Sequence, residues 1–156
     1  MGVGKPTLLG TVSGAVAGLV AITPASGFVG PISALIIGAA AGLICYGGVL
    51  LKSRLGYDDS LDVVGIHGLG GIWGALATGL FASTAINPNG TNGLFFGNPA
   101  QLGIQLLTVV ATMIFAFVTT FSILKVIDLV IGLKVTDEEE EKGLDLSLHN
   151  ETGYNF

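Results

Sequence analysis

Charged side chains are scarce in this chain of 156 residues. Asp, Glu, Lys and Arg make up 11% of it, whereas a soluble domain carries about 25%. Hydrophobic residues make up 51% of the chain, and its mean hydropathy is +0.78. This composition argues against a soluble globular domain and predicts a protein that crosses a membrane several times.

Cysteine is nearly absent, and so are the residue clusters that support catalysis. The single cysteine, Cys45, cannot form a disulfide within the chain, and the sequence has no zinc-type group of Cys and His residues. It also has no nucleophile–base pair and no phosphate-binding loop, so we expect no enzyme, no metal site and no cofactor. The formal net charge of −5 gives no support to nucleic-acid binding, which needs a basic face.

Glycine, by contrast, is abundant, with 25 residues in the chain. It has no three-residue period and lies among Ala, Val, Leu and Ile, which excludes collagen-like and disordered chains. Many glycines recur at a spacing of four, which places them on one face of a helix and lets a second helix approach closely. We interpret this pattern as close helix packing rather than as a ligand site. These glycines are Gly10, Gly14, Gly18, Gly38, Gly42, Gly70 and Gly74.

Four long apolar stretches have the length of membrane-spanning helices, which need about 20 mainly apolar residues. We predict an all-α polytopic membrane protein with helices at about residues 7–23, 32–51, 63–81 and 102–131. Residues 1–132 then form the transmembrane region, and residues 133–156 form a cytoplasmic tail.

All the basic residues fall on one side of these predicted helices. The two loops on the other side, residues 24–31 and 82–101, contain no charged residue. Because Lys and Arg accumulate in cytoplasmic loops, we predict a cell-membrane protein with both termini of the chain in the cytoplasm. The basic residues are Lys5, Lys52, Arg54, Lys125, Lys134 and Lys142.

His67 is the only histidine within the predicted helices. An ionisable side chain inside a membrane is costly unless it faces a cavity or a partner, so His67 is a candidate functional residue. We expect a neutral imidazole, which offers one hydrogen-bond donor and one acceptor, with space beside it at Gly65 and Gly68. The alternative is a histidine that hydrogen-bonds the backbone of a neighbouring helix.

Two aspartates precede this histidine. Asp62 lies five residues before His67, and Asp59 lies three residues earlier. Carboxylates suit the N-terminus of a helix, where they accept hydrogen bonds from free N–H groups. A secondary interpretation is that they gather cations at the cytoplasmic mouth of a pathway.

The tail begins with the signals of a short helix. Thr136 and Glu139 fit a capping box, residues 137–142 then form the helix, and Gly143 suits the left-handed position after its end. From Gly143 to His149 apolar and polar residues alternate. We interpret this stretch as a segment that docks on another surface.

Several segments of the chain resemble the ammonium transporter family, the Amt/Mep/Rhesus proteins. They are residues 4–6, 13–25, 58–68 and 132–135, followed by residues 142–145 with His149. The resemblance covers essentially the whole chain, which looks like the last four of the family's eleven helices with its cytoplasmic tail. It implies a homotrimer with one narrow hydrophobic pore in each subunit, through which ammonium crosses as ammonia.

The resemblance also implies roles for single residues. His67 matches the second of the family's paired pore histidines. Asp62 and Asp59 match acidic residues before it, and Thr23 matches a residue close to the pore. A count along the third helix puts His67 only about 7 Å past Asp62, nearer the cytoplasmic edge than a mid-membrane residue should be. We therefore expect this helix to begin inside a recessed vestibule.

The tail is similar to the family's regulatory C-terminus at Gly143, Leu144, Asp145 and His149. Ser147 stands where some members carry a phosphorylatable residue, and a phosphate there would add roughly two negative charges and undock the tail. The resemblance also implies a PII-type signalling protein as a partner at this face.

The first seven helices of the family have no counterpart in this chain. We therefore expect a C-terminal fragment that is inactive alone and needs the missing N-terminal helices. Two alternatives stay open. One is an ammonium sensor of the same family, which a docking tail suits equally well. The other is a non-transporting four-helix assembly subunit, which the composition alone allows.

Overall fold

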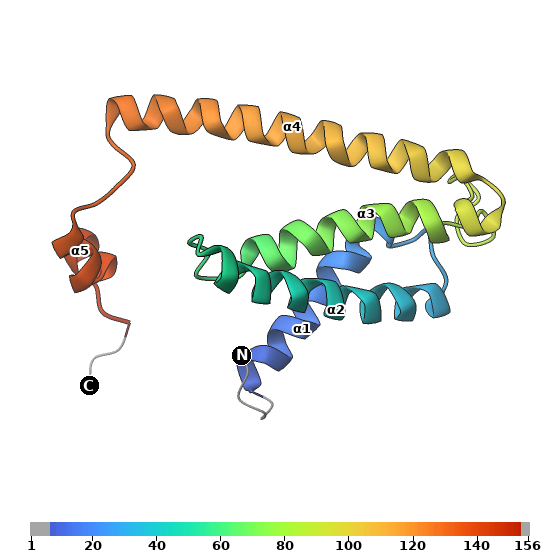
Figure 1. The fold of residues 1–156 in the computed structure, drawn as a ribbon, viewed down its shortest axis with the longest axis horizontal. Coiled ribbons are helices and arrows are strands. Elements are labelled where there is room, and N and C mark those ends of the chain that lie inside the picture. The colour runs from blue at the N-terminus through green and yellow to red at the C-terminus, as the bar shows by residue number, and fades with distance from the viewer. Residues whose placement is uncertain (1–6, 154–156) are drawn as a thin grey trace. The chain divides into compact units, whose positions relative to one another are not determined.

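Helices are the only regular secondary structure between residues 7 and 153, the part that the computed structural model describes, and no strand occurs there (Figure 1). The chain divides into two compact units, Met1–Ala111 and Thr112–Phe156. Lys5 and the motif at residues 4–6 lie outside the described residues. The helices are α1 (Leu8–Ile22), α2 (Pro31–Leu55), α3 (Leu69–Phe81), α4 (Pro99–Val130) and α5 (Asp137–Lys142).

Four helical stretches are long and apolar enough to cross a membrane, which confirms the all-α fold and its four membrane helices. The clearest difference in bounds is at the end of α2, which continues to Leu55 instead of residue 51. Gly56 ends it in the left-handed conformation, with φ 68°, and donates its N–H to the Lys52 carbonyl at 2.9 Å. The extra turn carries cations, which are favourable at a helix C-terminus. The four stretches are Leu8–Ala25, Pro31–Leu55, Val64–Phe81 and Pro99–Val130.

Local sequence explains where α1 and α2 begin. The Thr7 hydroxyl accepts a hydrogen bond from the Gly10 N–H at 3.1 Å and caps α1. Pro31 opens α2, where the missing N–H has no intrahelical partner to lose. Between them, α1 tightens into a 3₁₀ turn at Thr23–Ala25.

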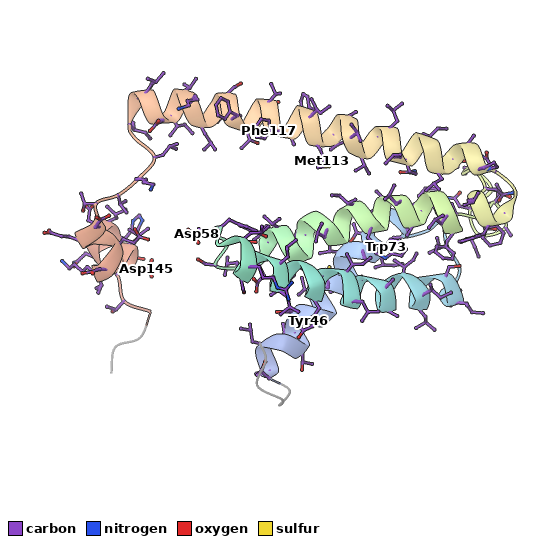
Figure 2. All side chains as sticks on the ribbon, in the orientation of Figure 1. Tyr46, Asp58, Trp73, Met113, Phe117 and Asp145 are labelled. Atoms are coloured by element: carbon purple, nitrogen blue, oxygen red, sulfur yellow. The ribbon has the colours of Figure 1, made fainter. Side chains whose placement is uncertain are left out.

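Helices α1, α2 and α3 contact one another and enclose the core of the first unit (Figure 1). Trp73 of α3 reaches towards α2, where its indole N–H donates to the Ile37 carbonyl at 3.0 Å (Figure 2). Most of the fully buried side chains are small, so the helices lie close together. The buried core residues are Ala17, Ala21, Ala25, Ile37, Ala41, Cys45, Ile66 and Ala77.

Two glycines of α3 bring it close to its neighbours, at Gly74 to the backbone of α1 and at Gly70 to a side chain of α2. A Cβ atom at Gly74 would lie 2.2 Å from the Ala21 carbonyl oxygen of α1, and one at Gly70 would lie 3.1 Å from the Cys45 sulfur of α2. At these two positions the glycines allow the close packing that we expected. The other glycines of the pattern have no atom of another described helix within 4 Å of an added Cβ, so the glycine faces of α1 and α2 are open; they are Gly10, Gly14, Gly18, Gly38 and Gly42.

The second unit holds the C-terminal part of α4 and the tail. The short helix expected in the tail is present as α5, Asp137–Lys142, with its capping box. A π-helical turn, Asp145–His149, follows it. The sequence did not predict this turn.

Replacing Gly74 with Ala should destabilise the protein, because the added Cβ would collide with the Ala21 carbonyl and push α1 and α3 apart. We expect the free energy of unfolding to fall by about 1–3 kcal/mol, the usual cost of overpacking, with a lower Tm in detergent solution. Gly71→Ala is the matched control, since nothing lies within 4 Å of a Cβ there. Equal Tm values for the two variants would contradict the close approach of these helices.

Candidate functional site

His67 lies in a π-helical turn, Val64–Gly68, that leads directly into α3. The Leu69 N–H bonds back to the Val64 carbonyl, five residues earlier, which is the hydrogen bond that defines such a turn. π turns are rare and frequently occur at functional sites. The third membrane helix therefore starts with an irregular turn, and hydropathy could not reveal it.

The His67 side chain is exposed, whereas Gly65 and Ile66 on the same turn are buried. A Cβ at Gly65 would lie 3.1 Å from the Val49 backbone nitrogen, so this side of the turn rests on α2. No hydrogen bond reaches the imidazole from any residue between 7 and 153. Within that part of the chain, both ring nitrogens are available to another group.

His67 is level with the middle of α2 and not with its end. The Cys45 thiol donates to the Ile66 carbonyl, with sulfur and oxygen 3.6 Å apart. Cys45 lies ten residues before Leu55, the last residue of α2. At 1.5 Å per residue, α2 continues about 15 Å beyond this contact. This contact therefore places His67 about 15 Å from the end of α2, whereas the count from Asp62 along the third helix gave about 7 Å.

Asp59 caps the start of the third helix. One oxygen of its carboxylate accepts the Val63 N–H at 2.8 Å, and the other accepts the Val64 N–H at 2.8 Å. These two N–H groups belong to the first helical turn and have no intrahelical acceptor. The capping role that we predicted for one of the two aspartates therefore belongs to Asp59.

Asp62 has a different partner. Its carboxylate forms an ion pair with the Lys52 ammonium of α2, and the same ammonium donates to the Asp59 carbonyl at 2.8 Å. Asp62 has a positive φ of 56°, which is uncommon for a residue other than glycine. From the sequence, Lys52 indicated only the orientation of the helices, and its pairing with Asp62 was not predicted. The one available signal is the spacing of ten residues between Lys52 and Asp62.

Thr23 lies away from His67. Its hydroxyl donates to the Leu19 carbonyl at 2.7 Å, within its own helix. Thr23 follows the Ala21 carbonyl that faces Gly74, and Gly74 is seven residues past His67, about 10 Å along the helix. No hydrogen bond joins Thr23 to His67 among residues 7–153.

A cavity of about 260 Å³ lies among α1, α2 and the π turn. The open glycine faces of α1 and α2 form part of its wall, and Ser13, Tyr46 and Asp62 contribute polar groups. Ile66 lines the cavity, but His67 does not. Sequence reasoning missed Ser13 and Tyr46, because isolated hydroxyl groups in membrane helices carry no distinctive pattern.

The tail residues gather around the Ser147 hydroxyl. It donates to the Gly143 carbonyl at 3.0 Å and lies 3.4 Å from the Glu139 carbonyl, so the π turn folds back against α5. Gly143 has φ 92° and ψ 133°, which is a positive φ but not the left-handed helical conformation that we expected. The backbone is extended at Gly143 because it leads from α5 into the π turn at Asp145–His149. Asp145 and His149 both belong to the π turn, and Leu144 just before it is exposed.

The capping box of α5 affects the charge of Glu139. The Thr136 N–H donates to the Glu139 carboxylate at 2.9 Å, and the Thr136 hydroxyl lies 2.8 Å from the same oxygen. These hydrogen bonds favour the ionised form, the backbone bond most strongly, and lower the pKa of Glu139 below its ordinary value.

The four membrane-length helices define a helical protein that crosses the membrane several times. The family described as the Ammonium Transporter Family matches residues 1–154. The chain belongs to the ammonium transporter family.

Two relatives and two solved structures are similar to this chain. It is 52% identical to an ammonium transporter of Bacillus subtilis over 151 residues, which covers 96% of this chain and 37% of the relative. It is 54% identical to an ammonium transporter of Aquifex aeolicus over 155 residues, which covers 99% of this chain and 36% of the relative. The crystal structure of Saccharomyces cerevisiae Mep2 matches with TM-score 0.80 and 36% identity over 86% of this chain and 31% of that one. The crystal structure of Candida albicans Mep2 matches with TM-score 0.79 and 37% identity, over 87% of this chain and 31% of that one. The chain thus spans little more than a third of the length of the curated relatives that it matches.

Replacing Asp59 with Ala should weaken the start of the third helix, because the Val63 and Val64 N–H groups lose their acceptor. The expected cost is about 1 kcal/mol, the usual value of a helix cap, with faster hydrogen exchange at these two amides. Asp58→Ala is the control, since the Asp58 carboxylate accepts only from the Ser60 hydroxyl at 3.3 Å among the described residues. Unchanged exchange in Asp59→Ala would contradict the capping role.

The capping box should open in acid. Because the pKa of Glu139 is lowered in the folded tail, its stabilising effect on α5 is complete above the unfolded-state value of about 4.3 and is lost as the pH falls through the folded pKa. An NMR titration of the Glu139 side chain and the Thr136 amide would follow this change. Thr136→Ala removes one of the two donors, so it should raise the pKa of Glu139 part of the way to its ordinary value. A pKa that does not respond to this substitution would contradict the assignment.

Proposed function

We propose that this chain is the C-terminal part of an ammonium transporter and that His67 lines its pathway. Family membership supports ammonium transport as the activity, and the alignment with a third of each relative supports a partial chain. The observation that carries the proposal is the position of His67. Its imidazole is exposed, has no hydrogen-bond partner among residues 7–153, and is level with the middle of a membrane-length helix.

The chemistry of the substrate suits such a residue. Moving the ammonium ion into an apolar environment is very costly, whereas neutral ammonia loses far less hydration energy. A neutral imidazole accepts one hydrogen bond and donates another, so it can hold ammonia or water without trapping a cation. Ammonium transfers its proton to water before this point, so that neutral ammonia alone passes the apolar section.

The remaining pathway residues have supporting roles in this proposal. Asp59 and Asp62 organise the cytoplasmic approach to His67, and Thr23 lies further along the pathway towards the other side. The basic residues lie on the cytoplasmic side, so both termini of the chain are cytoplasmic. The chain requires the N-terminal helices of the family to complete a pore, assembles with them as a homotrimer, and does not conduct alone.

The tail is the regulatory part of the proposed transporter. Gly143, Leu144, Asp145 and His149 form the docking segment, and a PII-type signalling protein is its partner. A phosphate on Ser147 would replace the hydroxyl that contacts the Gly143 carbonyl and would repel Asp145. The turn would then open.

A chimera tests the transport assignment. Residues of this chain replace the 151 aligned residues of the Bacillus subtilis ammonium transporter, and the chimera is expressed in cells that lack ammonium uptake. We expect growth on low ammonium and uptake of labelled methylammonium. His67→Ala should lower the uptake rate per transporter by roughly tenfold or more, equal to about 1.4 kcal/mol in activation free energy.

Val64→Ala is the matched control, because Val64 is also exposed on the π turn and loses a similar volume. Uptake by His67→Ala at the rate of the unmodified chimera would remove His67 from the pathway. A chimera that reaches the membrane but transports nothing would count against the transport assignment itself. Uptake by this chain expressed alone would overturn the proposal that it needs the other helices.

A further inference from the structure

One face of α2 contacts the segment before and within the π turn, residue by residue. The Cys45 thiol bonds the Ile66 carbonyl, a Cβ at Gly48 would lie 3.1 Å from the Gly65 Cα, and the Lys52 ammonium pairs with Asp62. The three α2 positions are spaced by three and four residues and therefore share one face. α2 thus holds the turn along its length, and Lys52 forms the only charged contact of the three.

Lys52 bonds to two points of the connecting segment at once. Its ammonium reaches the Asp62 carboxylate and also the Asp59 carbonyl, at 2.8 Å. Only about a fifth of either side chain in the ion pair is exposed, 22% for Lys52 and 21% for Asp62. Water therefore screens this pair less than it screens a surface pair.

The backbone around Asp62 needs such a partner. With φ 56°, Asp62 is in a conformation that residues with a Cβ seldom adopt. Its N–H donates to the Asp59 carbonyl at 3.1 Å, and its carbonyl accepts the Ile66 N–H at 2.9 Å. The Asp62 backbone therefore links the Asp59 carbonyl, which Lys52 binds, to Ile66, the residue immediately before His67.

We propose that Lys52 is a positioning residue for His67. By holding Asp62 and the Asp59 carbonyl against the last turn of α2, it sets where the third helix begins and therefore the direction of the imidazole. This inference rests on the proposed role of His67 in the pathway. Removal of the Lys52 charge releases Asp62 from its conformation, and the turn that follows shifts. A misplacement of about 1 Å at a reacting group can cost about 100-fold in rate.

Arg54 is a control that distinguishes a positioning role of Lys52 from a general effect of its positive charge. It lies two residues after Lys52 in the same last turn of α2, carries the same charge, and is exposed. Among residues 7–153 it has no ion pair or hydrogen bond with another side chain. A general effect of positive charge at this end of the pathway would therefore appear in both residues, whereas positioning involves Lys52 alone.

The test uses the same chimera with Lys52→Gln, Lys52→Arg, Arg54→Gln and His67→Ala. For each variant, the amount in the membrane, the methylammonium uptake rate and the ammonium concentration that halves this uptake are measured. We expect Lys52→Gln to lower the rate per transporter by about tenfold, within the range for a displaced group, and to change the half-inhibiting ammonium concentration. Lys52→Arg, which keeps a donor for Asp62, should restore most of the rate, and Arg54→Gln should leave both quantities unchanged.

Each other result counts against the inference. If Lys52→Gln only reduces the amount of protein, with rate and inhibition per transporter unchanged, Lys52 has a structural role alone. If Arg54→Gln gives the same loss as Lys52→Gln, the effect is one of charge. If His67→Ala loses uptake while Lys52→Gln does not, positioning fails and the proposed pathway stands. If His67→Ala transports normally, the role of His67 fails, and the inference fails with it.

Discussion

The contact between α2 and residues 59–70 determines where the candidate site lies. In a membrane, helices have little hydrophobic driving force towards one another and associate through close packing and polar contacts. Both occur here, because Gly48 and Gly65 let the backbones approach and Lys52 pairs with Asp62 at the end of the same face. The level of His67 along α2 follows from this contact and is not a property of the third helix alone.

Much of the fold could be predicted from the sequence, because long apolar runs specify membrane helices directly. The end of α2 was placed too early, since its last turn contains Lys52 and Arg54 and no longer looks apolar. The capping box of α5 could also be predicted, because Thr136 and Glu139 are three residues apart. The two π turns could not, since one extra residue in a helical turn leaves no mark on hydropathy.

The sequence indicates candidate residues for the site but not the partners that these residues have in the structure. His67 stands out because an imidazole is rare in an apolar run. The different partners of Asp59 and Asp62 were not predictable, because they depend on which of the two aspartates lies against α2 in the folded chain. Lys52 was missed for the same reason. The open glycine faces of α1 and α2 show the opposite limit, since their sequence pattern indicates packing that residues 7–153 do not contain.

The π turn at Val64–Gly68 closes its hydrogen bond over five residues, whereas an α-helical turn closes one over four. Each residue of a regular helix turns the next by about 100°, so a turn that holds one more residue directs its side chains differently from the regular turns after it. Here the wider turn holds Gly65 and Ile66, which are buried, together with His67, which is exposed. Gly70 and Gly74 keep their packing while His67 is released from it. The start of one helix thus presents a packing surface and an exposed imidazole on adjacent residues.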